Sequence, residues 1–235
     1  MSKNALITGA GSGIGFAIAG ALLGRGWNVA ICGRNEAKIE RASARLAGAS
    51  PRGKGSIHAA AVEVSEPAAV KRWVAGARER FGPPDLLVNN AGVGAWGDIG
   101  SLPDEAWDQV MAVNLKGAFL CTREVLPFMR AKGGGYIVNI SSLAGKKGMA
   151  GISAYSASKF GLIGFTQCLN AEEKGNNIRA TAICPGYVAT PMSAGARVPA
   201  ADMIQPEDIA ATVLYLLDLS PKVLIQEVVI ERIGA

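Results

Sequence analysis

The chain has 235 residues, of which 49% are hydrophobic and 18% are charged, and its formal net charge is +5. This composition excludes a disordered or fibrous chain, and the length fits one α/β domain spanning residues 1–235. The 24 basic residues are scattered and form no long run, so we expect a small anionic ligand and no nucleic acid. No apolar run approaches the roughly 18 residues of a membrane span, and apolar patterning begins at residue 4, without room for a signal peptide. We expect a cytoplasmic protein with no membrane partner.

Short β-rich apolar runs alternate with helical patterns along the whole chain. The expected strands are residues 5–8, 27–32, 57–62, 85–89, 135–140, 178–183 and 223–230, and the expected helices are 15–26, 68–81, 107–131 and 156–173. Strand, helix and strand in succession require crossover connections, which make the strands parallel and cover both sheet faces with helices. The sequence therefore predicts a doubly wound parallel sheet of the Rossmann type with about seven strands. Ligands of such sheets bind at the carboxyl ends of the strands.

A glycine-rich turn, TGAGSGIG, follows the first expected strand and opens the first helix. Gly9, Gly13 and Gly15 give a GxxxGxG spacing, which differs from the GxGxxG of the general dinucleotide fingerprint. Glycine permits unusual backbone dihedrals and lets the backbone approach a pyrophosphate held at a helix amino terminus. A tight turn alone needs one glycine, so three favour cofactor binding. A second motif, GASPRGK at residues 48–54, has P-loop spacing but lacks the Ser or Thr that must follow.

The end of the second expected strand bears on which nicotinamide cofactor binds. Gly33 stands where an acidic residue would bind the ribose of NAD, and Arg34 follows it. A guanidinium with no neighbouring anion suits a 2′-phosphate, which favours NADP(H) over NAD(H). Two alternatives stay open: Arg34 as a solvated charge, and Glu36 as a ribose ligand.

Five motifs follow one another in order and carry a resemblance to a known family. They are TGAGSGIG at 8–15, NNAG at 89–92, NISS at 139–142, YSASK at 155–159 and PGYVAT at 185–190. With these motifs the chain, from about residue 3 to residue 190, closely resembles the short-chain dehydrogenase/reductase family and its 3-oxoacyl-reductase-like subgroup. The resemblance implies a nicotinamide-dependent oxidoreductase that interconverts a carbonyl and a secondary alcohol.

The resemblance also implies roles for individual residues. Tyr155 matches the acid/base of the family, and Lys159 matches the lysine that binds the nicotinamide ribose and lowers the tyrosine pKa. Ser142 matches the serine that polarises the carbonyl, with Ser141 as its rival, and Asn114 matches the anchor of a water-linked proton relay. The positions implied to bind cofactor are Gly9, Ser12, Gly13, Ile14, Gly15, Arg34, Asn35, Glu63, Val64, Asn90, Ala91, Gly92, Tyr155, Lys159, Pro185, Gly186, Val188 and Thr190. Glu63 stands where relatives often carry an adenine-contacting Asp.

The physical chemistry of the Tyr155 and Lys159 pair agrees with these roles. Hydride delivery to a ketone leaves an alkoxide that must gain a proton, and an ordinary tyrosine is a poor base for the reverse step at neutral pH. Residues four apart share a helix face, so Lys159 can lie beside Tyr155. Two unit charges about 4 Å apart in an effective dielectric near 20 interact by roughly 4 kcal/mol, enough to lower the pKa of Tyr155 toward neutrality.

Two other classes of function compete with this interpretation. Ser156 and Lys159 match the SxxK of serine acyl-enzymes, but the companion motifs and GxSxG are missing from the sequence. A non-catalytic NADP(H)-binding sensor would not need Ser142, Tyr155 and Lys159. The single histidine, His58, is expected on an edge strand, and the four cysteines are expected to be buried and reduced, so we predict no metal site.

The substrate is not specified by the sequence. A 3-oxoacyl-(acyl carrier protein or CoA) substrate stays open, because Lys146 and Lys147 could attract an anion, while the carboxyl terminus lacks the glycine-rich end of many 3-oxoacyl reductases. Trp96 is expected either near the mouth of the site or as a surface or interface aromatic, and residues 191–205 are expected to form a short substrate lid. We expect a homodimer or homotetramer, with the helices at 107–131 and 156–173 in the dimer interface.

Overall fold

The protein is described by a computed structural model that covers residues 3–49, 55–196 and 198–234. Its strands are β1 (Asn4–Thr8), β2 (Asn28–Gly33), β3 (Ile57–Ala61), β4 (Leu86–Asn89), β5 (Gly135–Ile140), β6 (Ile178–Pro185) and β7 (Glu227–Ile230). Its α-helices are α1 (Gly13–Gly24), α2 (Glu36–Ala49), α3 (Pro67–Phe81), α4 (Asp104–Met111), α5 (Gly117–Ala131), α6 (Ser153–Glu172) and α7 (Pro206–Asp218). The P-loop-like stretch falls mostly outside the described residues.

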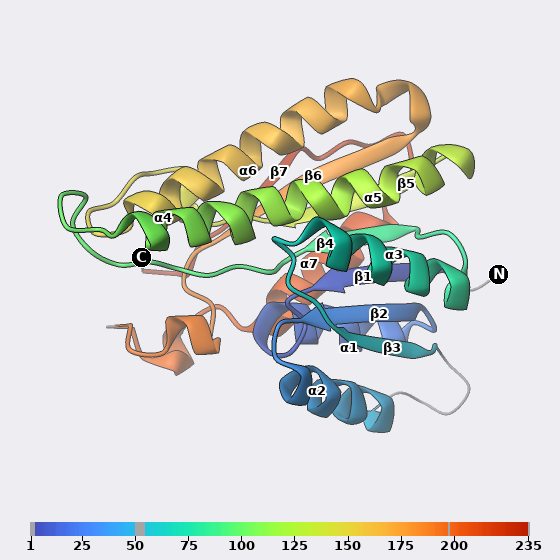
Figure 1. Cartoon of the computed structure of the whole chain (residues 1–235), viewed down its shortest axis with the longest axis horizontal. Helices are drawn as coiled ribbons and strands as arrows, with labels where there is room; N and C mark the ends of the chain where they lie inside the picture. Colours follow the sequence, from blue (N-terminus) through green and yellow to red (C-terminus); the bar gives the residue numbers. More distant parts are fainter. Residues whose placement is uncertain (1–2, 50–54, 197, 235) are drawn as a thin grey trace.

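The seven strands form one parallel sheet in the order β3-β2-β1-β4-β5-β6-β7 (Figure 1). Side chains alternate between its two faces: Ala5 and Ile7 of β1 pack with α1, α2 and α7, while Leu6 packs with α3 and α5. The prediction of a doubly wound sheet is confirmed. The strand order reverses between β1 and β4, which is where such sheets bind ligands.

Several elements differ from the sequence prediction. The expected helix 107–131 is divided by a π-helical turn, η1 (Ala112–Lys116), and the expected strand 223–230 is paired only over β7. Helices α2 and α7 were not expected. Helix α2 is rich in charge, and its buried stripe of Ile39, Ala42 and Leu46 is interrupted by solvent-facing residues.

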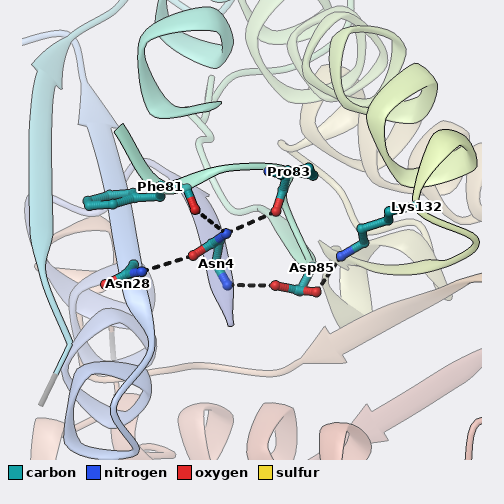
Figure 2. Close-up of polar contacts among 6 residues, drawn as sticks. All are labelled: Asn4, Asn28, Phe81, Pro83, Asp85 and Lys132. Carbon is teal, nitrogen blue, oxygen red and sulfur yellow. Dashed lines mark hydrogen bonds and ion pairs between the residues drawn. The ribbon is translucent and has the colours of Figure 1, made fainter. Parts of the chain in front are cut away.

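Asn4 braces the amino edge of the sheet, away from the predicted site (Figure 2). Its side-chain nitrogen donates to the carbonyls of Phe81 (2.6 Å) and Pro83 (3.1 Å), and its oxygen accepts from Asn28 (3.0 Å). Its backbone N–H donates to the carboxylate of Asp85 at 2.7 Å, and that carboxylate also pairs with a lysine of the α5–β5 turn. These bonds fix the start of β1 against the start of β4, so the two strands reach the opposite edge in register.

The cysteine prediction is partly wrong. Cys32, Cys121 and Cys184 are buried free thiols, but Cys168 is exposed because it lies on the outer face of α6. His58 lies on β3, the edge strand, as expected.

Candidate active site

A cavity of about 400 Å³ opens at the carboxyl ends of the strands, around the point where the strand order reverses. The predicted residues that line it are Gly9, Ser12, Gly13, Ile14, Arg34, Asn35, Glu63, Val64, Asn90, Ala91, Gly92, Ser142, Tyr155, Lys159, Pro185, Gly186, Val188 and Thr190. Gly15 and Asn114 are not among the lining residues. The fold therefore brings nearly all of the predicted site to one place.

The first part of the cavity is the turn from β1 into α1. Helix α1 begins at Gly13 with neither an acidic residue in its first turn nor a side-chain cap from Ser12. Its first N–H groups and the positive end of its dipole therefore face the cavity, an arrangement that suits a phosphate. Gly13 has φ +58°, and a Cβ there would lie 2.9 Å from Cγ2 of Thr190. The bare backbone fits the pyrophosphate of a dinucleotide, because a side chain here would narrow the cavity.

Gly15 supports this turn from behind. A Cβ at Gly15 would lie 2.5 Å from Nδ2 of Asn90. That nitrogen donates to the carbonyls of Thr8 (2.9 Å) and Gly9 (3.1 Å). Gly15 is therefore needed for packing, which lets Asn90 hold the glycine turn against the end of β4.

Charged side chains gather at the end of the cavity beside β2 and β3. Arg34 and Lys38 both line it, and the backbone N–H of Lys38 donates to the side chain of Asn35 at 2.8 Å. The expectation that Arg34 has no neighbouring anion is wrong, since Nε of Arg34 lies 3.8 Å from Oε2 of Glu63. Glu63 also accepts from the N–H (3.2 Å) and hydroxyl (3.0 Å) of Ser65. Glu36 is not among the lining residues.

The two serines after β5 have different surroundings. Ser141 is buried, and its hydroxyl donates to the carbonyl of Lys159 at 3.0 Å. Both serines line the cavity, but Ser142 is only half-buried, and its hydroxyl accepts from the N–H of Ala144 at 3.1 Å. The geometry therefore favours Ser142 over Ser141 as the serine that meets a ligand.

Tyr155 and Lys159 lie together on α6, but their electrostatics differ from the expectation. Burial raises the pKa of Tyr155, and the hydrogen bond with Ser142 lowers it in part. Nζ of Lys159 lies 5.6 Å from the centre of the Tyr155 ring and donates to the carbonyl of Ile140 at 2.8 Å. Burial lowers the pKa of Lys159 itself to about 8. The lysine is held by a backbone carbonyl and is costly to charge, so in this geometry it does not bring the tyrosine toward neutrality.

Asn114 lies in the π-helical turn and is buried. Its side-chain oxygen accepts from the N–H of Val93 at 2.8 Å, and its nitrogen donates to the carbonyl of Val93 (2.9 Å) and to the hydroxyl of Ser158 (3.0 Å). Asn114 thus joins the loop after β4 to the Tyr155 helix, and its amide group is occupied by these contacts.

The outer wall is formed by the loop after β6, which is held by two contacts. The N–H of Gly186 donates to the carbonyl of Ile230 in β7 at 2.9 Å. Farther along, Val188 pairs with Ile204 across the expected lid. Met192 of the lid lines the cavity, and position 197 lies outside the described residues.

Some lining residues were not predicted as ligands from the sequence. They are Gly11, Gly33, Lys38, Ile39, Val62, Val93, Val113, Ile140, Ser141, Pro191, Met192 and Ser193. Lys38 is the one with a charge, and it could have been found from its place one turn into the helix that follows β2. In the part of the chain that the structure describes, no group of three His, Cys, Asp or Glu side chains could hold a metal ion.

Comparison with known proteins agrees with this fold. The chain belongs to the short chain dehydrogenase family, an oxidoreductase family, because the family's sequence model matches residues 3–200. It is 38% identical over 237 residues to granaticin polyketide synthase putative ketoacyl reductase 1 of Streptomyces violaceoruber, covering 91% of this chain and 85% of that one. It is 39% identical over 234 residues to the (3R)-3-hydroxyacyl-CoA dehydrogenase of Rattus norvegicus, covering 92% and 89%.

Among solved structures, actinorhodin polyketide ketoreductase with NADPH superposes with a TM-score of 0.89 at 35% identity, covering 98% of this chain and 96% of that one. The residues of this chain described by the structure include no helix that is both long and apolar enough to span a membrane.

Proposed function

We propose that this protein is an NADP(H)-dependent oxidoreductase that interconverts a carbonyl and a secondary alcohol. The observation that supports it most is one cavity shared by two sets of residues. The glycine turn and the uncapped start of α1 form a dinucleotide cradle, and Ser142, Tyr155 and Lys159 line the same cavity. When bound, a nicotinamide cofactor supplies or accepts the hydride.

In reduction, Tyr155 is the general acid. Hydride addition to the carbonyl carbon moves the π electron pair onto oxygen, and the Tyr155 hydroxyl delivers the proton that completes the alcohol. Its raised pKa keeps the phenol protonated and ready for this direction. Ser142 donates a hydrogen bond to the same oxygen, which stabilises the charge that develops there.

Lys159 and Asn114 support this proton transfer in different ways. Lys159 would help to hold a bound nicotinamide cofactor, and its ammonium would favour the phenolate that remains after Tyr155 has given up its proton once the amine is released from the carbonyl of Ile140. Asn114 is a positioning residue, because its amide fixes the backbone of Val93 in the cavity wall and contacts Ser158 in the Tyr155 helix.

The preference for NADP(H) rests on charge. Arg34 and Lys38 place two cations at the end of the cavity beside β2, where a 2′-phosphate would lie. Glu63 is the opposing charge, so Lys38 supplies the cation that Glu63 does not pair with in this geometry.

A second candidate, reduction of a 3-oxoacyl thioester, is favoured by two relatives. Their names describe a ketoacyl reductase and a hydroxyacyl-CoA dehydrogenase. Comparing kcat/KM for acetoacetyl-CoA with that for a simple methyl ketone separates the two: a clear preference for the thioester selects this candidate.

The proposal is tested by incubating purified protein with NADPH and a panel of ketones while cofactor absorbance is followed. We expect oxidation of NADPH by the wild type. Tyr155→Phe should lower kcat at least a hundredfold with little change in NADPH affinity, because it removes one hydroxyl and leaves the glycine turn, Arg34 and Lys159 in place. Tight NADPH binding without turnover of any carbonyl would instead identify a sensor.

We also propose a homodimer through the layer of α5 and α6. Both helices contribute buried residues to the same core cluster on one face of the sheet, and they expose Phe119 and Phe160. A mass measurement by light scattering should give at least a dimer, and Phe160→Glu should lower the mass. A monomeric wild type would contradict this assembly.

A further inference from the structure

Large apolar side chains are exposed on the loops at the carboxyl edge of the sheet. They are Trp96 and Ile99 after β4, Met149 after β5, and Tyr187 and Met192 after β6. Because these three strands are neighbours and parallel, their loops leave the sheet at one edge. Apolar groups gathered on a surface mark binding sites more often than isolated ones do.

Trp96 has the largest side chain of this set, and its ring packs against a neighbouring stretch of backbone. The ring lies against the backbone of Gly94, where an added Cβ would be 2.4 Å from Cη2 and 2.7 Å from Cζ2. The indole therefore packs on Gly94, and any larger residue at this position would displace it. Trp96 is nevertheless 67% exposed, so the face of the ring away from Gly94 is open to a ligand.

The loop that carries Trp96 is tied to the segment that starts the Tyr155 helix. The N–H of Gly97 donates to the carbonyl of Gly151 at 3.0 Å, and Gly97 pairs with Ile152. Ile152 in turn accepts from the N–H of Ser156 at 2.8 Å, in the first turn of α6. These contacts tie the loop that carries Trp96 to the amino-terminal end of α6, the helix that carries Tyr155.

Trp96 is not among the residues that line the cavity, but two lining residues belong to the same loops as this apolar edge. Val93 lines the cavity and directly precedes Gly94, on which the Trp96 ring packs. Met192 lines the cavity and is itself exposed at its rim. A ligand whose reacting carbon lies between Ser142 and Tyr155 therefore meets apolar side chains where it leaves the cavity.

We propose that Trp96 forms an apolar subsite for the part of the substrate beyond the reacting carbonyl, so that the enzyme selects ketones and alcohols with an extended apolar chain. The proposal rests on the proposed function for its reaction but not for its binding surface. Each methylene that leaves water for the indole face contributes about a three- to fourfold gain in kcat/KM.

The test uses methyl alkyl ketones whose chain lengthens from ethyl to heptyl, reduced with NADPH by wild type, Trp96→Ala and Tyr215→Ala. Tyr215 is the matched control, because it is an aromatic residue of similar exposure, 57%, that lies on α7 and not on the loops at the carboxyl edge of the sheet. Wild type and Tyr215→Ala should gain kcat/KM with each methylene, while Trp96→Ala should lose at least tenfold on the longest ketone and little on the shortest.

Binding of the matching secondary alcohols to the NADP⁺-loaded protein, followed by calorimetry, separates the two proposals. If no ketone is reduced but chain-length dependence of alcohol binding disappears in Trp96→Ala, the subsite stands and the proposed reaction fails. If chain-length dependence is the same in Trp96→Ala and wild type, the subsite is refuted. A change in molecular mass in Trp96→Ala with unchanged chain-length dependence would show that the ring covers a protein contact instead, which also refutes it.

Discussion

Replacing Lys159 by methionine should stabilise the fold while ending catalysis. The side chain is buried, and burial lowers the pKa of Lys159 from 10.5 to about 8. At about 1.4 kcal/mol for each pH unit between these values, keeping the lysine charged destabilises the folded state by about 3 kcal/mol at pH 7. Methionine removes this penalty but leaves the carbonyl of Ile140 without its 2.8 Å bond, a loss of about 1 kcal/mol. The expected net gain is about 2 kcal/mol.

The pH dependence gives this prediction a second signature. The unfolded chain binds the lysine proton up to its ordinary pKa of 10.5, whereas the folded chain releases it near 8. Between these values the unfolded state holds more protons, so wild-type stability rises with pH. The penalty is therefore full below about pH 8 and disappears toward pH 10.5, and the advantage of Lys159→Met should shrink over the same interval.

Urea unfolding at pH 7 and at pH 10, followed by circular dichroism, measures both effects. Lys71→Met is the matched control, because Lys71 is exposed on α3 and its loss should change the free energy of unfolding by less than about 0.5 kcal/mol. The reasoning fails if Lys159→Met is no more stable than wild type at pH 7, or if its gain persists unchanged at pH 10.

Three further predictions concern the proposed reaction. Glu63→Gln should lower the KM for NADP⁺ by up to about fivefold and leave the KM for NAD⁺ nearly unchanged, because it frees the guanidinium of Arg34 from a partly exposed ion pair. Steady-state kinetics with both cofactors measure this effect, and Glu66→Gln is the exposed control. Gly13→Ala should weaken NADPH binding at least tenfold in a fluorescence titration, since it combines a positive φ with a close contact, whereas Gly24→Ala has open space and should bind normally. The kcat for ketone reduction should fall as pH rises through about 8, where Lys159 loses its charge, and a flat profile would contradict a role for the ammonium.

Much of the fold could be predicted because strand and helix patterns are local. The seven strands were located to within a few residues, except that the first half of 223–230 is unpaired. The pattern gave no sign that 107–131 is divided by a π-helical turn; Asn114 in that turn bonds to Val93, in a loop that is distant in the sequence. Nor did the pattern show the exposure of Cys168, which depends on which face of α6 meets the sheet.

In the site, too, local motifs were found in the sequence, whereas features that depend on tertiary packing were not. The family resemblance picked out Ser142, Tyr155 and Lys159, and the fold brings all three to one cavity. The resemblance did not show that Ile140 holds the lysine amine or that burial raises the tyrosine pKa, since both depend on packing between β5 and α6. The charge pair of Arg34 with Glu63 joins the ends of β2 and β3, and a sequence motif carries no distance between them.

The π-helical turn at Ala112–Lys116 has a consequence for the angular phase of the long helix. An α-helix advances about 100° for each residue, so one extra residue in a turn rotates everything after it by about that angle relative to everything before it. The buried faces of α4 and α5 therefore point in different directions: α4 packs against α6, and α5 packs against α3. Deleting Leu115 would restore one continuous α-helical phase, and one of the two helices would then turn its buried face away from its partner. The π-helical turn therefore allows one long helix to pack against two different partners.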